Sequence, residues 1–216
     1  MNQILETLKK THSTSVSDGL RGRNVMASYI KPVIPGVLLI GPAYTVRPVP
    51  GDHLAVVKGL AEANPGDVLV IDGGGALEVA MLGEMMCTFG QKRGLAGAVV
   101  DGAIRDVVGI RRIGFPVFTR TIVPRSAVEE SLGQVQVPVG CGGVAVLPGD
   151  WIMGDDDGVT VIPAAMLEEV IRGALESEAV DDVLRGGADF MHTTGMDKIL
   201  VEKEGRAAPA IHAREV

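Results

Sequence analysis

Apolar positions in the middle of the chain come in short runs that alternate between strand-like and helix-like patterns. Residues 68–72 (VLVID) form a continuous apolar run after the turn residues Pro65-Gly66-Asp67, as a buried strand does. A second buried run stops at Asp101-Gly102, and residues with helical periodicity lie between the two runs. This repetition of strand, helix and strand predicts an α/β fold with mixed β-sheets flanked by helices.

Further elements are expected on both sides of this central unit. Glycines at 73–75 close the strand at 68–72, and a Gly-Pro corner at residues 41–42 divides an earlier apolar stretch into two strands. The last thirty residues have the pattern of a weakly ordered arm. We expect one domain over residues 1–216, with short N-terminal helices and a C-terminal helical arm. Helices are predicted at residues 2–10, 15–20, 53–63, 76–94 (interrupted at Gly83), 106–113 and 164–185, and later strands at 116–120 and within 134–163.

Bulk composition limits the class of partner. A formal net charge of −7 and the lack of a Lys or Arg run argue against a nucleic-acid surface, whereas local cations could still bind small anions. No apolar stretch reaches the roughly 18 residues of a membrane helix, and the polar N-terminus is unlike a secretory signal. Two cysteines, Cys87 and Cys141, fit a reducing compartment. We therefore expect a cytoplasmic protein with neither nucleic acid nor a membrane as a partner.

The most distinctive polar residues lie at the helix interruption and after the second buried run. The first element is Gly83-Glu84-Met85-Met86, the second is the stretch from Asp101 to Asp106 (DGAIRD), and twenty residues separate Glu84 from Arg105. Taken alone, Arg105-Asp106 after a strand is a surface turn with a local ion pair, because such pairs are common and contribute little. Glu84 alone reads as a solvated helix residue.

These two elements and their interval resemble the RraA-like family, which includes the 4-hydroxy-4-methyl-2-oxoglutarate and 4-carboxy-4-hydroxy-2-oxoadipate aldolases. Further similar stretches run from Ser17-Asp18 to Asp155–Val159, so the resemblance covers roughly residues 15–185. It implies a fold of the swivelling β/β/α type assembled as a trimeric ring, either a homotrimer or a hexamer. It also implies a metal-dependent lyase that acts on a small 2-oxo acid.

The chemistry of such a lyase assigns a role to each residue. Cleavage beside a hydroxyl, or decarboxylation of a 2-oxo acid, leaves pyruvate enolate, whose oxygen needs a cation or a Lewis acid. Arg105 offers a planar donor fork, and Asp106 with several waters suits Mg²⁺ or Mn²⁺. Backbone N–H groups of Gly83, Glu84, Met85 and Met86 would bind the pyruvate carboxylate if a helical turn opens after Gly83. Glu84 would orient a water for proton transfer.

Several positions depart from the family pattern. Position 84 is Glu where the family often has Asp, His53 stands where Asn is common, and Val57 replaces a frequent histidine. Gly109 and Ile110 stand where many aldolases of the group place Asp or Glu, so one metal-site carboxylate is missing. The departures at His53 and Val57 concern the identity of the substrate more than the class of reaction.

A carboxylate from a neighbouring subunit is also implied by the resemblance, supplied by the helix after the last strand. Glu178 and Asp181 occupy that region, and we assign Asp181 as the catalytic candidate. The alternative is that both belong to an ordinary solvated acidic face of a helix.

Other suggestive motifs have simpler interpretations. Asp155-Asp156-Asp157-Gly158 has consecutive rather than alternate carboxylates, which favours a β-turn over a calcium loop. Gly73-Gly74-Gly75 lacks the spacing of a phosphate loop and indicates backbone crowding. The four histidines are scattered, which argues against a zinc site.

Two functions therefore stay open. The first is a lyase that cleaves a 4-hydroxy-2-oxo acid to pyruvate plus a second 2-oxo acid, with oxaloacetate decarboxylation through the same enolate. The second is a regulator that binds and inhibits a ribonuclease, because the family also includes such an inhibitor. Glu84, Arg105 and Asp106 favour the lyase, and the missing acid at Gly109 favours the regulator.

Overall fold

The computed structural model describes residues 2–206, which form two compact units. The first unit ends at Ala174 and contains every strand, together with the expected short N-terminal helices; the second begins at Leu175 and contains the helical arm. No helix in the described part of the chain is long and apolar enough to cross a bilayer. The helices are α1 (Asn2–Leu8), α2 (Ser13–Gly19), α3 (Leu54–Glu62), α4 (Glu84–Lys92), α5 (Val107–Ile113), the short 3₁₀ helix η1 (Ala164–Met166), α6 (Leu167–Arg185), α7 (Phe190–Thr194) and α8 (Met196–Arg206).

The first unit is built on a mixed sheet in the order β1-β5-β4-β3-β2-β9-β10, with β6 also paired to β2 and a separate β7-β8 hairpin. Strands β2, β3, β4 and β5 run parallel to one another. Strand β9 pairs antiparallel with β2 on one side and with β10 on the other. This confirms the predicted mixed α/β architecture. The strands are β1 (Lys31–Pro32), β2 (Leu39–Arg47), β3 (Val68–Leu82), β4 (Gly97–Ile104), β5 (Val117–Ile122), β6 (Gln134–Val135), β7 (Val139–Cys141), β8 (Val144–Val146), β9 (Trp151–Asp155) and β10 (Gly158–Ile162).

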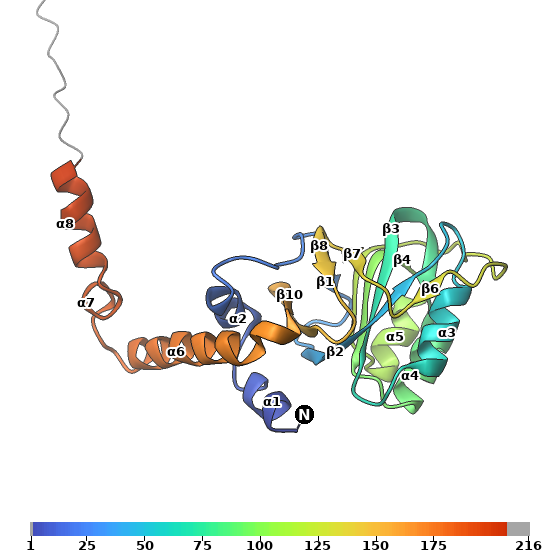
Figure 1. Cartoon of the computed structure of the whole chain (residues 1–216), viewed down its shortest axis with the longest axis horizontal. Coiled ribbons are helices and arrows are strands. Elements are labelled where there is room, and N and C mark those ends of the chain that lie inside the picture. The colour runs from blue at the N-terminus through green and yellow to red at the C-terminus, as the bar shows by residue number, and fades with distance from the viewer. Residues whose placement is uncertain (1, 207–216) are drawn as a thin grey trace, which may run out of the picture. The chain divides into compact units, whose positions relative to one another are not determined.

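Apolar residues cover both faces of the parallel strands. Leu69 and Ile71 of β3 pack with Leu60 of α3 and Ile110 of α5 in one core cluster, and α3, α4 and α5 lie together on this face (Figure 1). Val68 and Val70, which point the other way, pack in a second cluster with residues of β7 to β10. Burial on two faces explains why the strand reads as a continuous apolar run.

Three expectations about the strands are wrong. Gly41-Pro42 is no corner, because β2 continues through it: residues up to Pro42 pair with β9, and residues from Ala43 pair with β3. Pro42 has no N–H for a ladder, and it lies where the strand changes partner. The glycines at 73–75 do not end β3, and β4 continues past Asp101-Gly102 to Ile104.

The helix expected from residue 76 begins only at Glu84, because residues 76–82 belong to β3. Gly74 and Gly75 have φ angles of +60° and +71°, and the ladder between β3 and β4 shifts register after Ile71. These glycines form an irregularity that lets the strand resume, with Ala76, Ala80 and Leu82 paired to β4. Pairing with a neighbouring strand thus overrides the local helical pattern.

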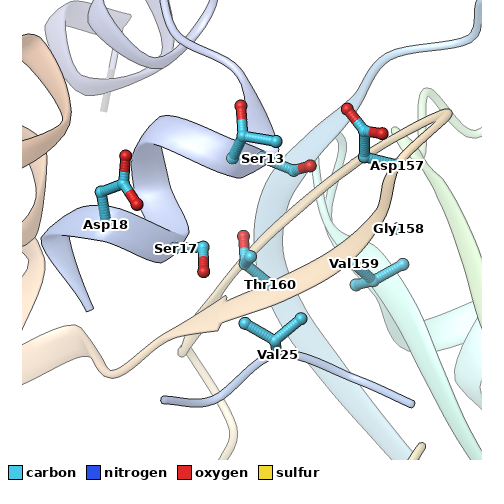
Figure 2. A pocket seen from close by; sticks show the side chains of 9 residues that line it. Ser13, Ser17, Asp18, Val25, Asp157, Gly158, Val159 and Thr160 are labelled. Carbon is cyan, nitrogen blue, oxygen red and sulfur yellow. The ribbon is translucent and has the colours of Figure 1, made fainter. Parts of the chain in front are cut away.

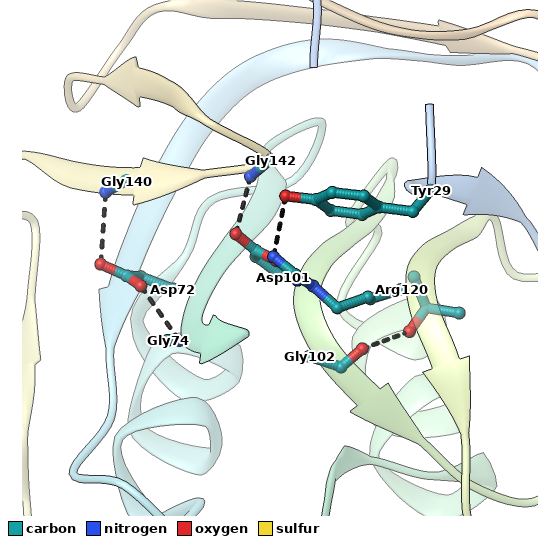
Figure 3. A network of polar contacts seen from close by, with 9 residues as sticks. Tyr29, Asp72, Gly74, Asp101, Gly102, Arg120, Gly140 and Gly142 are labelled. Atoms are coloured by element: carbon teal, nitrogen blue, oxygen red, sulfur yellow. Dashed lines mark hydrogen bonds and ion pairs between the residues drawn. The ribbon is translucent and has the colours of Figure 1, made fainter. Parts of the chain in front are cut away.

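Asp101 anchors a polar network beside these strands (Figure 3). One carboxylate oxygen accepts hydrogen bonds from Arg120 of β5 through Nε at 2.8 Å and Nη2 at 2.5 Å, and the other accepts the Gly142 N–H at 2.8 Å. The Arg120 guanidinium lies over the Tyr29 ring, 3.9 Å from its centroid, and donates to the Tyr29 hydroxyl. The first residue of the DGAIRD element therefore has a structural role.

We expect Asp101→Ala to lower the free energy of unfolding by about 2–3 kcal/mol, because it leaves a largely buried guanidinium and a backbone N–H without their acceptor. Urea unfolding measures this loss. Asp72→Ala is the matched control: Asp72 accepts N–H groups of Gly74 and Gly140 at 3.2 Å each, and its removal should cost less than half as much. Equal losses for the two variants would contradict a special role for Asp101.

Candidate active site

A small pocket of about 50 Å³ lies where β3 and β4 end. Carboxyl ends of parallel strands meet at one edge of a sheet, which is where open α/β sheets bind ligands. The pocket brings together five of the residues that the sequence assigned to substrate or metal. Its lining consists of His53, Ala80, Leu82, Gly83, Met85, Met86, Arg105 and Asp106.

The N-terminus of α4 forms one wall of this pocket. Gly83 is extended and is the N-cap residue, so the helical turn expected after it is confirmed. The N–H groups of the first turn have no carbonyl inside the helix, and the helix dipole adds positive potential. A Cβ on Gly83 would lie 2.7 Å from Oδ2 of Asp106 and 3.2 Å from the Arg105 side chain. Glycine therefore allows α4 and the Arg105-Asp106 pair to approach.

Arg105 and Asp106 leave β4 in an unusual conformation. Asp106 has φ 62° and ψ 35°, in the left-handed region that Asp tolerates better than most residues. Its Oδ2 lies 3.4 Å from Nε of Arg105 and 3.3 Å from the Glu84 nitrogen. Both side chains are about half exposed, so the pair is open to a ligand. Strained backbone of this kind is common at functional sites.

The backbone and the side chain of Glu84 contact different residues. Its backbone N–H faces Asp106, whereas its carboxylate lies 2.6 Å from Nη2 of Arg112 on α5. A Cβ on Gly109 would lie 2.0 Å from the Glu84 carboxylate, so this carboxylate occupies the space of any side chain at position 109. The proton-transfer role of Glu84 stays a prediction.

His53 is the polar residue of the pocket lining to which the sequence assigned no site role. Its side chain is 7% exposed, and Nε2 lies 2.9 Å from Oε1 of Glu129. The signal that could have found it is its position directly after the Pro50-Gly51-Asp52 turn, where the family pattern has another polar residue. Val57, the other departure nearby, does not line the pocket.

Asp52 holds the segment around Glu129 in place through hydrogen bonds. The Asp52 carboxylate accepts backbone N–H groups of Leu54, Glu130 and Ser131, each at 2.7 Å. These bonds, that of Leu54 foremost, lower the pKa of Asp52 below its ordinary value of 3.8. The carboxylate is therefore a buried anion that holds two distant chain segments together.

Asp181 lies on α6 in the second unit, where its carboxylate is 3.6 Å from Nη2 of Arg185. Glu178 lies 3.9 Å from the same guanidinium. The contribution of Asp181 to a neighbouring subunit's site stays a prediction.

A larger hollow of about 300 Å³ lies between α2 and the β9-β10 turn (Figure 2). Its lining includes Ser17, Asp18 and Asp157 but none of the described Lys, Arg or His side chains, so it offers no cation for an oxyanion. The predicted β-turn at Asp155–Gly158 is confirmed as the β9-β10 connection. Asp155 caps α2 instead, accepting from the Ser13 nitrogen and hydroxyl.

A thiol nucleophile is also excluded near the pocket. Cys87 of α4 is fully buried, and burial raises the pKa of its thiol to about 12. The polar groups that remain in the pocket are Arg105, Asp106, His53 and the first turn of α4.

A family model described as RraA-like, Aldolase/RraA, matches residues 13–161, which include every residue of the pocket. The chain belongs to the RraA-like family. A Halalkalibacterium halodurans protein, provisionally named a 4-hydroxy-4-methyl-2-oxoglutarate aldolase, is 42% identical over 170 residues, which are 79% of this chain and 81% of that protein. A Thermus thermophilus protein named 4-hydroxy-4-methyl-2-oxoglutarate aldolase is 38% identical over 112 residues, 52% of this chain and 68% of that protein.

Solved structures of RraA-like proteins include one with a regulatory description. Streptomyces coelicolor RraAS2, described as an unusual member of the RNase ES inhibitor RraA protein family, is 31% identical with a TM-score of 0.78. The match covers 86% of this chain and 96% of RraAS2. Proteins similar to this chain are therefore named in two ways, as aldolases and as members of a ribonuclease inhibitor family.

The lowered pKa of Asp52 predicts a specific pH dependence of stability. A carboxylate with a lower pKa in the folded state stabilises the fold fully above its ordinary value, and this contribution is lost as the pH falls below 3.8. We expect Asp52→Asn to be less stable than wild type at neutral pH, and the difference to shrink as the pH falls below 3.8. Urea unfolding over a pH series measures it. A difference that stays constant with pH would contradict the ionised role of Asp52.

Proposed function

We propose that this RraA-like protein is a divalent-metal-dependent lyase that cleaves a 4-hydroxy-2-oxo acid of the 4-hydroxy-4-methyl-2-oxoglutarate type. The products are pyruvate and a second 2-oxo acid, and oxaloacetate is decarboxylated through the same pyruvate enolate. One observation carries the proposal: a single pocket holds a guanidinium, a carboxylate and the N-terminus of a helix. The aldolase names of two relatives support it.

The residues act on the substrate as follows. N–H groups of the first turn of α4, contributed by Met85 and Met86, bind the carboxylate of the pyruvate unit. Arg105 donates to the C2 carbonyl oxygen, where negative charge develops when the C3–C4 bond breaks and its electron pair enters the enolate. The proton of the C4 hydroxyl leaves as the new carbonyl forms, and the enolate takes up a proton on C3 to give pyruvate. Glu84, and Asp181 of a neighbouring subunit, are the carboxylates proposed to guide that proton through water.

Asp106 is the proposed metal ligand. The described residues contain no group of three or more His, Cys, Asp or Glu side chains placed to hold a metal ion. A single half-exposed carboxylate fits Mg²⁺ or Mn²⁺, which keep most of their water ligands, and does not fit Zn²⁺. When bound, such an ion supplies Lewis-acid stabilisation of the enolate oxygen. Asp106 would hold this ion.

The second candidate is an RraA-type regulator that binds and inhibits a ribonuclease. The similarity to RraAS2 favours it, together with the lack of a carboxylate at Gly109. A regulator needs surface contacts and no turnover. The two candidates are separated by an assay for pyruvate.

We expect Asp106→Ala to abolish Mg²⁺-dependent pyruvate release from oxaloacetate and from 4-hydroxy-4-methyl-2-oxoglutarate, with little loss of stability, because the residue lies in an exposed turn. EDTA should have the same effect on wild type. Arg105→Lys keeps the charge but loses the planar fork, so turnover should fall at least ~10-fold, or ~1.4 kcal/mol.

Asp157→Ala is the matched control, since this exposed Asp lies in the β9-β10 turn away from the pocket, and its turnover should equal that of wild type. A wild-type protein that releases no pyruvate with either metal would refute the lyase and leave the regulator. Full activity of Asp106→Ala would remove this residue from the metal site.

We also propose that the lyase assembles as a trimeric ring, or as a dimer of trimers, with Asp181 completing the site of a neighbour. Light scattering at assay concentration should then give a mass of three or six times 22.5 kDa, and Asp181→Ala should lower turnover without changing this mass. Its control is Asp182→Ala, whose exposed carboxylate pairs with the same Arg185. A fully active monomer would refute a shared site.

A further inference from the structure

The groups proposed to bind pyruvate leave one polar side chain of the pocket without a function. Arg105, Asp106 and the first turn of α4 account for the pyruvate unit. The other described lining residues are His53 and the apolar Ala80 and Leu82. A 4-hydroxy-2-oxo acid carries oxygen on C4, beyond the pyruvate unit. Of these remaining residues, only His53 can form a hydrogen bond to that oxygen.

The imidazole of His53 is held in a fixed orientation. His53 is the N-cap residue of α3, but its side chain makes no capping hydrogen bond. Glu129 binds Nε2 at 2.9 Å, and the ring is 7% exposed. A carboxylate on Nε2 favours the tautomer that carries its proton on Nε2, and this leaves the other ring nitrogen, Nδ1, as a hydrogen-bond acceptor. His53 is therefore set up as a recognition group and not as a helix cap.

Glu129 is itself positioned by the backbone on both sides. The Val128 N–H donates to the Gly51 carbonyl and the His53 N–H to the Val128 carbonyl, each at 2.9 Å. The next residue, Glu130, donates its N–H to Asp52 at 2.7 Å. The Glu129 side chain is 68% exposed, and exposed ion pairs add little stability. The fixed position of the Glu129 side chain therefore indicates that it orients His53, and that it does not contribute much to the stability of the fold.

We propose that His53, oriented by Glu129, hydrogen-bonds the oxygen on C4 of the substrate and thereby selects the part of the substrate beyond pyruvate. Glu129 is a positioning residue in this arrangement. The inference rests on the proposed lyase function, and it goes further because it assigns the recognition of the second half of the substrate.

Two reactions of one protein test this assignment. Exchange of the methyl protons of pyruvate in D₂O, followed by NMR, needs the groups that bind pyruvate, stabilise its enolate and move a proton at C3, whereas cleavage of 4-hydroxy-4-methyl-2-oxoglutarate also needs the part of the pocket beyond pyruvate. We expect His53→Asn and His53→Ala to lower kcat/KM for cleavage at least ~10-fold, mainly through KM, because a site that binds a substrate hydroxyl discriminates strongly. Exchange should stay within about twofold of wild type, since no pyruvate contact is removed.

Glu129 is tested by rescue. Glu129→Ala should reduce cleavage and spare exchange, and Glu129→Gln, which keeps an acceptor for Nε2, should recover part of the loss. Glu130→Ala is the matched control, because it removes the neighbouring exposed carboxylate and keeps the backbone bond to Asp52. Its cleavage rate should equal that of wild type.

The possible results show separately whether the role of His53 or the lyase function itself is wrong. If exchange persists and the His53 variants cleave as well as wild type, the recognition role is refuted and the lyase stands. If cleavage and exchange fall together, His53 supports the fold of the pocket and does not select the substrate. If wild type neither exchanges nor cleaves, the lyase and the inference that rests on it are both refuted.

Discussion

The site depends on the close approach between the N-terminus of α4 and the end of β4. Asp106 in the left-handed conformation turns its carboxylate back toward α4, and Gly83 leaves the space that this carboxylate needs. The helix N-terminus and the Arg105 guanidinium thus face the same small volume, and they bring N–H donors and a positive charge with them. A side chain at position 83 would push these groups apart. The Gly83–Met86 element and the end of the Asp101–Asp106 element therefore contact each other directly.

The residues of this contact could be named from the sequence because the Gly83–Met86 and Asp101–Asp106 elements resemble the RraA-like family, and the buried apolar runs identified the first parts of β3 and β4. The continuation of β3 through residues 76–82 could not be predicted, because its pairing partner lies some twenty residues further along the chain and local periodicity favours a helix. His53 was missed for a related reason. Its place in the pocket depends on the bond from its own N–H to the Val128 carbonyl and on the bond from the Glu130 N–H to the Asp52 carboxylate, which no local pattern reports.

Within the DGAIRD element, structure and proposed chemistry are assigned to different residues. Asp101 is nearly buried and ties Arg120 and the Gly142 backbone to β4, which fixes where the strand runs. Arg105 and Asp106 are about half exposed and open to the pocket. A hydrogen-bonded network at Asp101 fixes β4 before its end, and the strained turn at Asp106 follows this fixed part of the strand.

The two departures at positions 84 and 109 are one structural feature. Glutamate is one methylene longer than the aspartate that the family often has at position 84, and its carboxylate extends over α5 to Arg112. That path crosses Gly109, where even a Cβ would collide with it at 2.0 Å. An acidic side chain at 109 would bring both steric overlap and like-charge repulsion next to Glu84. The Glu84 carboxylate thus lies next to Gly109 on α5 and close to Arg112.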